Sequence, residues 1–451
     1  MNVLNSLFNK RIIVLGLGMT GRACVRFLKQ HQDNWNIQIS AMDTRADITP
    51  DPDISCFLGG FDEAEIAAAD VLVVSPGIDI ETPQIAQAAA AGKWILGDIE
   101  IFALYAAAHR PDVPIIAVTG SNGKSTVVTL LEWIAKQAGK RVALGGNIGI
   151  PALELFEQEA ELFILELSSF QLETTDSLQL ASACILNLSE DHMDRYESLS
   201  DYVGAKQRIY THSKQAVCLK EDALTHPLTS AHLSAADVDI VYISAQQNVE
   251  GWGLSQDKNS ICFNSEPLLA AKDIQLVGVH NLLNIQAALV MSAQVGIETH
   301  DAIRAAKTFT GLPHRCQKVR EVAGVTWIND SKATNVGACI AAIEGVTPSL
   351  KGRLFLIVGG DAKQADVQPL ASVFNQYVFK LLCFGKDAAL FMPLSVRSQR
   401  VTKLEEAVQV AANEAKAGDM VLLSPACASL DMFQSYMHRG NCFVEAVEAV
   451  A

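Results

Sequence analysis

Short apolar runs alternate with helix-like stretches along most of this chain. Continuous apolar runs are typical of strands buried on both faces of a parallel sheet, and the amphipathic stretches between them are typical of the helices that cover it. The runs fall into three series: 11–15, 37–42 and 71–75; then 114–118, 141–144, 162–166, 183–188 and 216–219; and finally 325–329, 354–358, 381–384 and 420–423. This pattern predicts an α/β protein of three domains, each built on a mainly parallel sheet flanked by helices.

Two stretches mark the expected domain boundaries. An alanine-rich helix over 99–108 closes the first series. Between about 240 and 277 the runs become short and alternating, which predicts a small antiparallel addition before a helix at 281–295. We expect a Rossmann-like domain over 1–103, a P-loop ATPase-like domain over 104–311 and a Rossmann-like domain over 312–451.

Composition excludes several classes of protein. The 451 residues carry 35 Lys and Arg against 50 Asp and Glu, a net charge of −15, with no Lys/Arg-rich run, so nucleic acid is not an expected partner. No apolar segment approaches the ~18 residues of a membrane span, and the N-terminus lacks the pattern of a secretion signal. Ten scattered cysteines without a Cys-x-x-Cys pair indicate a reducing compartment. We therefore expect a cytoplasmic protein, with no membrane partner, that acts as a monomer.

A phosphate-binding loop is indicated at Thr119-Gly-Ser-Asn-Gly-Lys-Ser-Thr126, between an apolar run and a helical pattern that begins near Val127. Backbone N–H groups at the glycines can converge on phosphate oxygens, Lys124 adds a charge, and the Ser125 hydroxyl can bind Mg²⁺. The general P-loop would place its first glycine at Val118, so this is a shorter form. An ordinary turn would explain the glycines, but a lysine at a helix N-terminus is unfavourable unless an anion lies there. The loop predicts ATP binding.

A second glycine loop, Gly16-Leu-Gly-Met-Thr-Gly21, directly follows the first predicted strand, and Asp43 ends the second. By pattern this is a dinucleotide fingerprint, but a glycine turn at a helix N-terminus accepts any pyrophosphate, so a nucleoside diphosphate fits equally well. A tight turn without a ligand would also explain it. Ser75-Pro-Gly77 is expected on the same sheet edge, which favours a binding surface there.

Metal and anion ligands are expected at the carboxyl ends of the other strands. Glu166 ends one strand and His192 follows the next, so both should lie on the sheet edge that holds Lys124, where they suit a divalent cation. Lys206, on a helical pattern over 201–209, has the character of a solvated lysine. In the third series the polar loops at 329–335, 359–363 and 424–429 predict a small-molecule site, and their lysines suit an anion.

Taken together, these motifs resemble the Mur ligases over almost the whole chain, in matching order and spacing. The motifs that carry the resemblance are Thr-Gly-Ser-Asn-Gly-Lys-Ser-Thr, Glu-Leu-Ser-Ser-Phe-Gln-Leu-Glu, Glu-Asp-His-Met-Asp-Arg-Tyr, His-Asn-Leu-Leu-Asn, Gly-Leu-Pro-His-Arg, Asn-Asp-Ser-Lys-Ala-Thr-Asn and Ser-Pro-Ala-Cys-Ala-Ser-Leu-Asp. Within the family, the chain is most similar to the ligases that add D-glutamate to UDP-N-acetylmuramoyl-L-alanine during peptidoglycan synthesis. The resemblance implies an ATP-dependent ligase that works through an acyl phosphate, with a UDP-substrate domain, an ATP and Mg²⁺ domain, and an amino-acid domain.

The resemblance also implies roles for individual residues. Those implied for the UDP-linked substrate are Met19, Thr20, Asp43, Thr44, Arg45, Gly77, Asn147 and His192. Those implied for ATP are Gly120, Ser121, Asn122, Gly123, Lys124, Ser125, Thr126, Asn284, Arg315 and Asp330. Those implied for D-glutamate are Thr334, Lys363, Ser429 and Tyr436. Ser125, Glu166, His192 and a carbamylated Lys206 would hold two Mg²⁺, and Lys124, Glu166, His192 and Lys206 would be catalytic. Closure of the domains would use hinges near 103–113 and 308–314.

Three positions depart from the family pattern. Ala362 stands where glycine is usual, so a positive φ there would be strained. Cys316 replaces a common aromatic residue, and Tyr436 replaces a phenylalanine of the amino-acid pocket. Alternative functions are a ligase of this family that adds another amino acid, an NAD(P)-dependent oxidoreductase built on the first glycine loop, and a non-catalytic nucleotide-binding protein.

Overall fold

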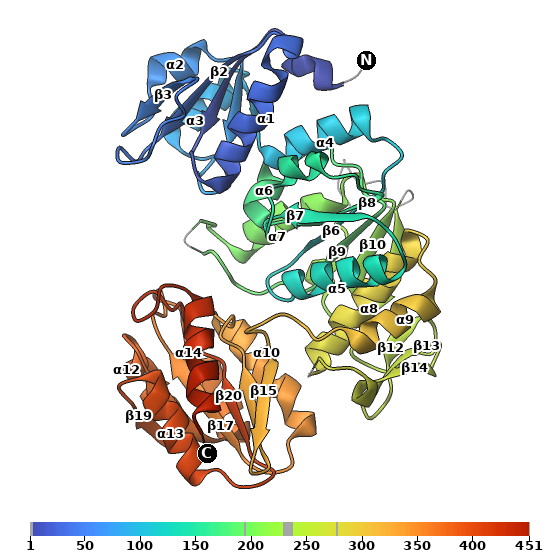
Figure 1. The fold of residues 1–451 in the computed structure, drawn as a ribbon, viewed down its shortest axis with the longest axis vertical. Coiled ribbons are helices and arrows are strands. Elements are labelled where there is room, and N and C mark those ends of the chain that lie inside the picture. Colours follow the sequence, from blue (N-terminus) through green and yellow to red (C-terminus); the bar gives the residue numbers. More distant parts are fainter. Residues whose placement is uncertain (1–2, 194, 229–237, 277, 451) are drawn as a thin grey trace. The chain divides into compact units, whose positions relative to one another are not determined.

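The computed structural model describes residues 3–193, 195–228, 238–276 and 278–450 (Figure 1). Contacts divide the chain into two compact units. The first comprises 1–188, 192–243 and 287–305, and the second comprises 189–191, 244–286 and 306–451. The predicted boundary at 103 falls inside helix α4 (Asp98–His109), and the one at 311 falls in the loop after helix α9 (Thr299–Thr308).

The first sheet is a five-stranded parallel sheet in the order β3-β2-β1-β4-β5. Its strands are β1 (Arg11–Leu15), β2 (Gln38–Asp43), β3 (Ser55–Leu58), β4 (Val71–Val74) and β5 (Trp94–Leu96). Its helices are η1 (Val3–Leu7), α1 (Met19–Trp35), α2 (Glu63–Ala68) and α3 (Pro83–Ala90). Every residue of β4 is buried, as expected for a strand covered on both faces.

The second sheet, also in the first unit, has six parallel strands in the order β11-β10-β9-β6-β8-β7. Its strands are β6 (Ile115–Thr119), β7 (Val142–Gly146), β8 (Leu162–Glu166), β9 (Ser182–Ile185), β10 (Gln215–Leu219) and β11 (Asp239–Ile243). Its helical elements are α5 (Lys124–Gln137), η2 (Ala152–Glu157), α6 (Ser169–Glu173), α7 (Leu199–Gln207), η3 (Arg208–Tyr210) and η4 (Ala223–Thr225).

The predicted antiparallel addition is confirmed over 252–270 in the second unit, whereas 240–243, the start of the predicted range, belong to β11 of the parallel second sheet. The addition is a three-stranded sheet of β12 (Trp252–Leu254), β13 (Ser260–Phe263) and β14 (Glu266–Ala270). The short η5 (Ala271–Asp273) and the long α8 (Val279–Gln294) follow it along the chain.

The last sheet has six strands in the order β15-β16-β20-β17-β18-β19. They are β15 (Gln317–Val322), β16 (Val325–Asn329), β17 (Leu354–Gly359), β18 (Val378–Phe384), β19 (Ser398–Arg400) and β20 (Met420–Leu423). All neighbours are parallel except β15 and β16. The helical elements are α10 (Val336–Val346), η6 (Thr347–Ser349), α11 (Leu370–Tyr377), α12 (Ala388–Phe391), η7 (Met392–Leu394), α13 (Leu404–Glu414) and α14 (Tyr436–Glu448).

Each predicted series therefore forms one mainly parallel sheet, while several details differ from the prediction. Strands β3, β5, β15 and β19 were not predicted, because they are short or carry polar residues: β15 reads Gln-Lys-Val-Arg-Glu-Val and β19 reads Ser-Gln-Arg. The run predicted as a strand over 183–188 leaves the ladder after Ile185. Helix α5 begins at Lys124, a few residues before the predicted start.

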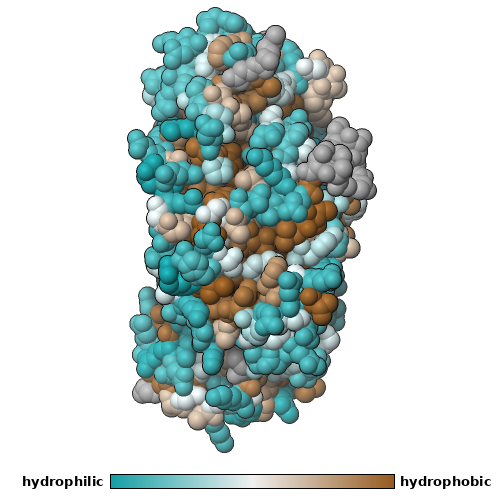
Figure 2. All heavy atoms as spheres, turned by 90° about the vertical axis from the view of Figure 1, so that its right-hand side faces the viewer, coloured by the Kyte–Doolittle hydropathy of each residue, from teal (hydrophilic) through white to brown (hydrophobic). Residues whose placement is uncertain are grey.

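Hydrophilic residues cover most of the face drawn in Figure 2. Among the described residues, no helix is long and apolar enough to cross a membrane. All ten cysteines are free thiols, and eight of them are buried, as expected for small apolar residues.

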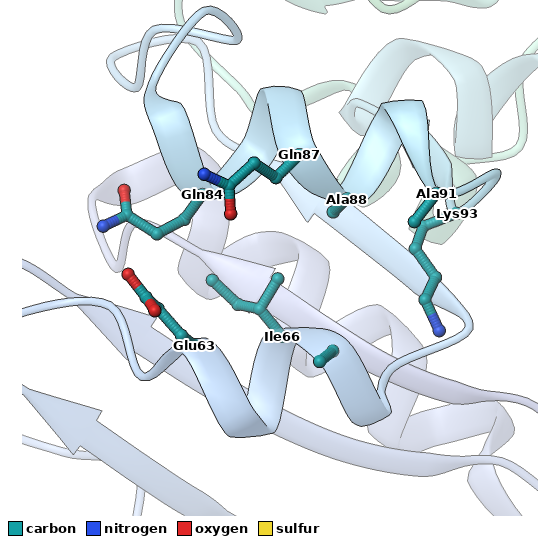
Figure 3. Close-up of a pocket in the computed structure, with 8 residues that line it drawn as sticks. Glu63, Ile66, Gln84, Gln87, Ala88, Ala91 and Lys93 are labelled. Atoms are coloured by element: carbon teal, nitrogen blue, oxygen red, sulfur yellow. The ribbon is translucent and has the colours of Figure 1, made fainter.

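Helices α2 and α3 leave a groove of about 250 Å³ between them, on one face of the first sheet (Figure 3). Four of its eight lining residues are aliphatic, with Glu63 and Gln84 toward one end and Lys93 toward the other. None of the residues predicted to bind a ligand lies in it.

Candidate nucleotide and substrate site

The loop between β6 and α5 folds as the predicted cradle. Gly120 (φ +141°) and Gly123 (φ +90°) both have left-handed backbone angles. A Cβ atom at position 120 would lie 3.2 Å from the Leu186 nitrogen and the Asn187 oxygen, so the loop is pressed against the chain that follows β9. Glycine is required at both positions because of these angles and, at Gly120, because of this contact.

Asn187 holds the cradle from outside. Its side chain accepts from the Asn122 backbone N–H (2.9 Å) and donates to the Asn122 carbonyl (2.9 Å), while its own carbonyl accepts from the Ser121 N–H (2.9 Å). This explains why the chain leaves the ladder after Ile185: the Leu186 N–H still donates to Thr119, the last residue of β6, but Asn187 bonds the loop. The sequence reading did not assign Asn187 a role, since an Asn after a strand is also typical of a simple turn.

Lys124 turns back over its own loop. Its Nζ donates to the carbonyls of Gly120 (2.7 Å) and Ser121 (3.0 Å). Ser125 and Thr126 are buried in the first turn of α5. The ammonium and the N-terminus of α5 are thus placed on the same cradle, as anion binding requires.

Lys206 is buried, so the interpretation as a solvated lysine is wrong. The residue is 2% exposed, its Nζ donates to Thr119 Oγ1 (3.2 Å), and it lies 4.8 Å from the centre of the Tyr202 ring. The Tyr202 hydroxyl in turn is 3.2 Å from Ser121 Oγ. Lys206 therefore belongs to the surroundings of the phosphate loop. The spacing of Tyr202 and Lys206, four residues apart on one helix, was the available signal.

The end of β8 carries a carboxylate that suits a cation. Glu166 is 3% exposed and its Oε1 accepts from Asn147 Nδ2 (2.9 Å). Its Oε2 is buried and has no hydrogen-bond partner among the described atoms. Leaving a buried carboxylate oxygen unsatisfied is costly, and a divalent cation would satisfy it.

The other predicted metal ligands differ from one another in burial. Ser125 is buried, whereas His192 is exposed, has a positive φ (+58°) and packs edge-to-face on Phe170 with 5.0 Å between ring centres. No cluster of three or more His, Cys, Asp or Glu side chains suited to a metal occurs within the described ranges. A site built on Glu166 would therefore draw on a hydroxyl, a single imidazole or a modified lysine as well.

The first glycine loop is held by close contacts. A Cβ atom at Gly21 would lie 1.8 Å from the Gly16 carbonyl oxygen, and the Ser75 hydroxyl donates to that same oxygen (2.7 Å). These contacts join the N-terminus of α1 to the ends of β1 and β4. Around this loop Met19 is 70% exposed, Thr20 is partly buried, and Thr44 and Gly77 are exposed.

The Asp43 carboxylate already accepts hydrogen bonds from other residues of the chain, which argues against the dinucleotide alternative. Its carboxylate accepts from the Leu17 N–H (2.6 Å) and from Arg45 through N–H (2.9 Å), Nε (2.9 Å) and an Nη (2.7 Å). The hydrogen bonds from Arg45 hold the pKa of Asp43 well below its usual range. Four donors use the lone pairs that would accept ribose hydroxyls in a dinucleotide site. Asp43 therefore positions the glycine loop and Arg45.

In the second unit, a buried arginine joins two of the three predicted loops of the last sheet. Arg439 is 0% exposed; it donates to Ser331 Oγ (3.0 Å) and Ser331 O (2.8 Å) on one side and to Cys427 O (3.1 Å) on the other. The loop at 359–363 is joined to the last one by a bridge between Asp361 and Ala428. The predicted convergence of these loops is thus present. Arg439 itself was not predicted, because nothing distinguishes it from a surface arginine of α14.

Several predicted ligand residues lie on these loops or beside them. Ser429 is buried, Thr334 is partly buried, Lys363 is exposed, and the Tyr436 ring lies 4.3 Å from Lys332 Nζ. Asp330 is buried and accepts from the Cys316 N–H (3.1 Å) and the Ser424 hydroxyl (2.9 Å), and burial raises its pKa to about 7.

The remaining predicted nucleotide contacts, Asn284 and Arg315, also belong to the second unit. Asn284 donates to Asn281 (3.1 Å) on α8. Arg315 is partly buried between two residues with positive φ, His314 (+64°) and Cys316 (+44°).

The expectation of strain at Ala362 is wrong. Ala362 does not have a positive φ; the turn instead places Gly359, Gly360, Lys363 and Gln364 in that region. The Ala362 N–H donates to Asp387 (2.8 Å), which holds the loop without a glycine at this position.

Comparison with known proteins covers almost the whole chain. Family models match as "Mur ligase MurD-like, N-terminal domain" over 10–97, "Mur ligase middle domain" over 118–292 and "Mur ligase, glutamate ligase domain" over 314–427. A relative from Vibrio vulnificus is 44% identical over 98% of both chains, and one from Marinobacter nauticus is 45% identical over 98% of this chain and 99% of its own. Both are named UDP-N-acetylmuramoylalanine–D-glutamate ligase.

Solved structures share the fold at lower identity. A MurF from Acinetobacter baumannii has a TM-score of 0.62 at 15% identity, covering 97% of this chain and 93% of that one. A pseudomurein peptide ligase type C from Methanothermus fervidus has a TM-score of 0.60 at 17% identity, covering 98% and 100%.

Proposed function

Because this chain belongs to the Mur ligase family, we propose that it joins D-glutamate to UDP-N-acetylmuramoyl-L-alanine using ATP, a step in making peptidoglycan precursors. The full-length similarity to ligases named for this reaction supports the choice of substrates. The observation that carries the proposal is the phosphate cradle with Lys124, Lys206 and Glu166 gathered around one sheet edge.

ATP is proposed to bind with its phosphates on the cradle of Gly120 to Thr126. Lys124 would exchange its bonds to the Gly120 and Ser121 carbonyls for phosphate oxygens, to which a cation bonds more strongly. Asn284, Arg315 and Asp330 would contact the nucleotide from the second unit. We therefore expect domain closure to be part of the reaction.

Mg²⁺ is proposed to bind at Ser125, Glu166 and His192, with a second ion supported by Lys206 as its carbamate. The buried, unpaired Oε2 of Glu166 supports this assignment. When bound, the ions would offset the negative charge of the phosphates during transfer. Carbamylation would also replace a buried cation, which is unfavourable, by a group able to coordinate metal.

The proposed reaction has two chemical steps. First, an oxygen of the substrate's L-alanine carboxylate attacks the γ-phosphorus of ATP; the bond from that phosphorus to the β–γ bridging oxygen breaks, and ADP leaves. Then the D-glutamate amine, having lost a proton, attacks the carbonyl carbon of the acyl phosphate. The tetrahedral intermediate expels inorganic phosphate and loses the second amine proton, which leaves an amide. Lys124 and Arg315 would stabilise the developing phosphoryl charge.

D-glutamate is proposed to bind to Thr334, Lys363, Ser429 and Tyr436, on or beside the loops at 329–335, 359–363 and 424–429. Its carboxylates suit a lysine and hydroxyl donors. The UDP moiety is proposed to lie at Met19, Thr20, Thr44, Arg45, Gly77 and Asn147, with Asp43 holding Arg45 in place. We further propose domains at 1–103, 104–311 and 312–451 in a cytoplasmic monomer.

The test is release of phosphate by the purified chain. It should require UDP-N-acetylmuramoyl-L-alanine, ATP, Mg²⁺ and D-glutamate together. Release with L-lysine or meso-diaminopimelate, but not with D-glutamate, would overturn the substrate assignment. Absence of release with any amino acid, together with reduction of a nicotinamide cofactor, would instead support the oxidoreductase alternative.

A further inference from the structure

Arg195, three residues after His192, is held between two acidic residues and an aromatic ring. Its Nε lies 3.2 Å from Asp79 Oδ2, and one Nη lies 3.7 Å from Glu173 Oε2. The guanidinium carbon is 4.3 Å from the centre of the Phe170 ring. The side chain is only 16% exposed. None of these contacts was anticipated from the sequence.

These partners come from segments that must be correctly positioned relative to one another for the proposed reaction. Asp79 follows Gly77 in the loop after β4, where the UDP moiety is proposed to bind. Phe170 and Glu173 lie on α6, the short helix that begins three residues after Glu166. Arg195 itself lies in the loop of His192. One side chain therefore joins the substrate loop, the helix behind the metal carboxylate and the histidine loop.

The contacts continue to the phosphate cradle through aromatic rings. Glu173 accepts a hydrogen bond from the Tyr196 hydroxyl, and the Tyr196 ring stacks on Phe170 at 6.0 Å. Tyr196 also packs edge-to-face on Tyr202 at 5.4 Å. Tyr202 contacts both Ser121 of the cradle and Lys206. An unbroken series of packed groups thus connects Asp79 to the ATP loop.

From this arrangement we propose that Arg195 is a positioning residue, which fixes the UDP-substrate loop relative to the metal and phosphate groups through its pairing with Asp79. Direct binding of a substrate phosphate by Arg195 is the competing explanation. It is disfavoured because two carboxylates already offset the charge of the guanidinium and the Phe170 ring covers one of its faces. The inference rests on the proposed function, since it concerns the geometry of that reaction.

The discriminating variant is Asp79→Asn. If Arg195 acts by positioning, Asp79→Asn and Arg195→Ala should each lower kcat by about tenfold or more, because small misplacements of reacting groups slow a reaction strongly. The double variant should have a kcat no lower than that of Arg195→Ala, because Asp79→Asn and Arg195→Ala both remove the same Arg195–Asp79 interaction. Arg195→Lys keeps the charge but loses the planar fork, so it should fall between wild type and Arg195→Ala.

Direct phosphate binding predicts a different pattern, which would overturn the proposal. Arg195→Ala would then raise the KM for the UDP substrate, with kcat unchanged, and Asp79→Asn would leave KM unchanged or lower it by freeing the guanidinium. A melting temperature and an affinity for an ATP analogue, measured for each variant, separate these effects from misfolding. If Asp79→Asn and Arg195→Lys each lower the melting temperature and lose affinity for the ATP analogue, the result would count against positioning and indicate a purely structural role for Arg195.

Arg141→Ala is the matched control. Arg141 pairs with Glu161 at 3.5 Å on an exposed surface, just before the first residues of β7 and β8, the sheet edge opposite the site. It should retain wild-type kcat and KM. If wild type itself releases no phosphate with D-glutamate, the proposed function fails. If wild type is active and Asp79→Asn matches it, the positioning role alone fails.

Discussion

The burial of Lys206 is the residue-level feature that bears most directly on the proposed chemistry. An ammonium 2% exposed, next to Thr119 and Tyr202, is costly to keep charged in the interior, so its position needs a reason. Reaction with CO₂ would give a carboxylate-bearing group beside the phosphate loop, which is the role implied by the family resemblance.

We expect Lys206→Ala to lose most ligase activity and to regain part of it when acetate or another short carboxylate is added, because a free carboxylate can occupy the space of the carbamate. Phosphate release measured with increasing carboxylate checks this. Lys206→Arg is the matched control: it keeps a cation but cannot supply a carbamate, so it should be inactive. An active Lys206→Arg enzyme would show that only positive charge is needed at this position.

Asp98, the first residue of α4, offers a pH-dependent test of burial. It is 2% exposed; Oδ2 accepts from Gln171 (3.0 Å), while Oδ1 is buried without a partner among the described atoms. Burial raises its pKa from 3.8 to about 6. Between these values the unfolded chain releases the proton and the folded chain keeps it, so stability falls as pH rises and then levels off above about 6.

We expect Asp98→Asn to remove this dependence. Relative to wild type it should gain stability on going from about pH 4 to above pH 6, by an amount on the order of 3 kcal/mol from the two pKa values. Melting temperatures of both proteins at a series of pH values measure the difference. Parallel profiles would show that Asp98 ionises normally in the folded protein.

At the scale of elements, the turn from β1 into α1 depends on a contact that only glycine permits. A Cβ atom at Gly21 would overlap the Gly16 carbonyl, whereas one at Gly18, in the same loop, would meet nothing within 4 Å and Gly18 is not among the residues with positive φ. We expect Gly21→Ala to lower the melting temperature markedly or prevent folding, and Gly18→Ala to change it little. Calorimetry of the two variants compares them directly. Equal effects would mean that the turn relaxes around the new methyl group.

Strands were predicted correctly from the sequence where burial of apolar side chains alone determines the structure. Buried central strands such as β4, β6, β8 and β17 are apolar up to their last residue, so burial alone identifies them. Edge strands β15 and β19 are polar and are strands only because a neighbour supplies hydrogen bonds. The local sequence does not identify that neighbour, because the neighbour is distant along the chain.

For the whole molecule, the proposed chemistry requires groups of both units to meet the same substrates. Lys124 and Glu166 belong to the first unit, and Arg315, Asp330 and Lys363 to the second. Beyond Thr308, the last residue of α9, the predicted hinge at 308–314 lies outside regular structure, with Gly311 at positive φ. Helix α4 occupies 98–109 and leaves only 110–113 of the other predicted hinge outside a helix.

We therefore expect ligands to contract the molecule. Small-angle scattering with a non-hydrolysable ATP analogue, Mg²⁺ and the UDP substrate should give a smaller radius of gyration than the protein alone, because closure brings the ligand groups together. Lys124→Ala, which weakens phosphate binding, should contract less at the same ligand concentration. An unchanged radius in wild type, with ligand binding verified, would contradict closure.

The sequence by itself determined the three series of strands, the short phosphate loop and the family, because apolar runs, glycine turns and motif spacing are local properties of the chain. Tertiary structure decided which polar groups serve the site. Asn187 holds the cradle, Asp43 accepts from Leu17 and Arg45, Lys206 is buried, Arg439 joins two loops, and Arg195 connects three segments. Each of these depends on partners distant in sequence, whose positions are set by packing and hydrogen bonding in the folded chain.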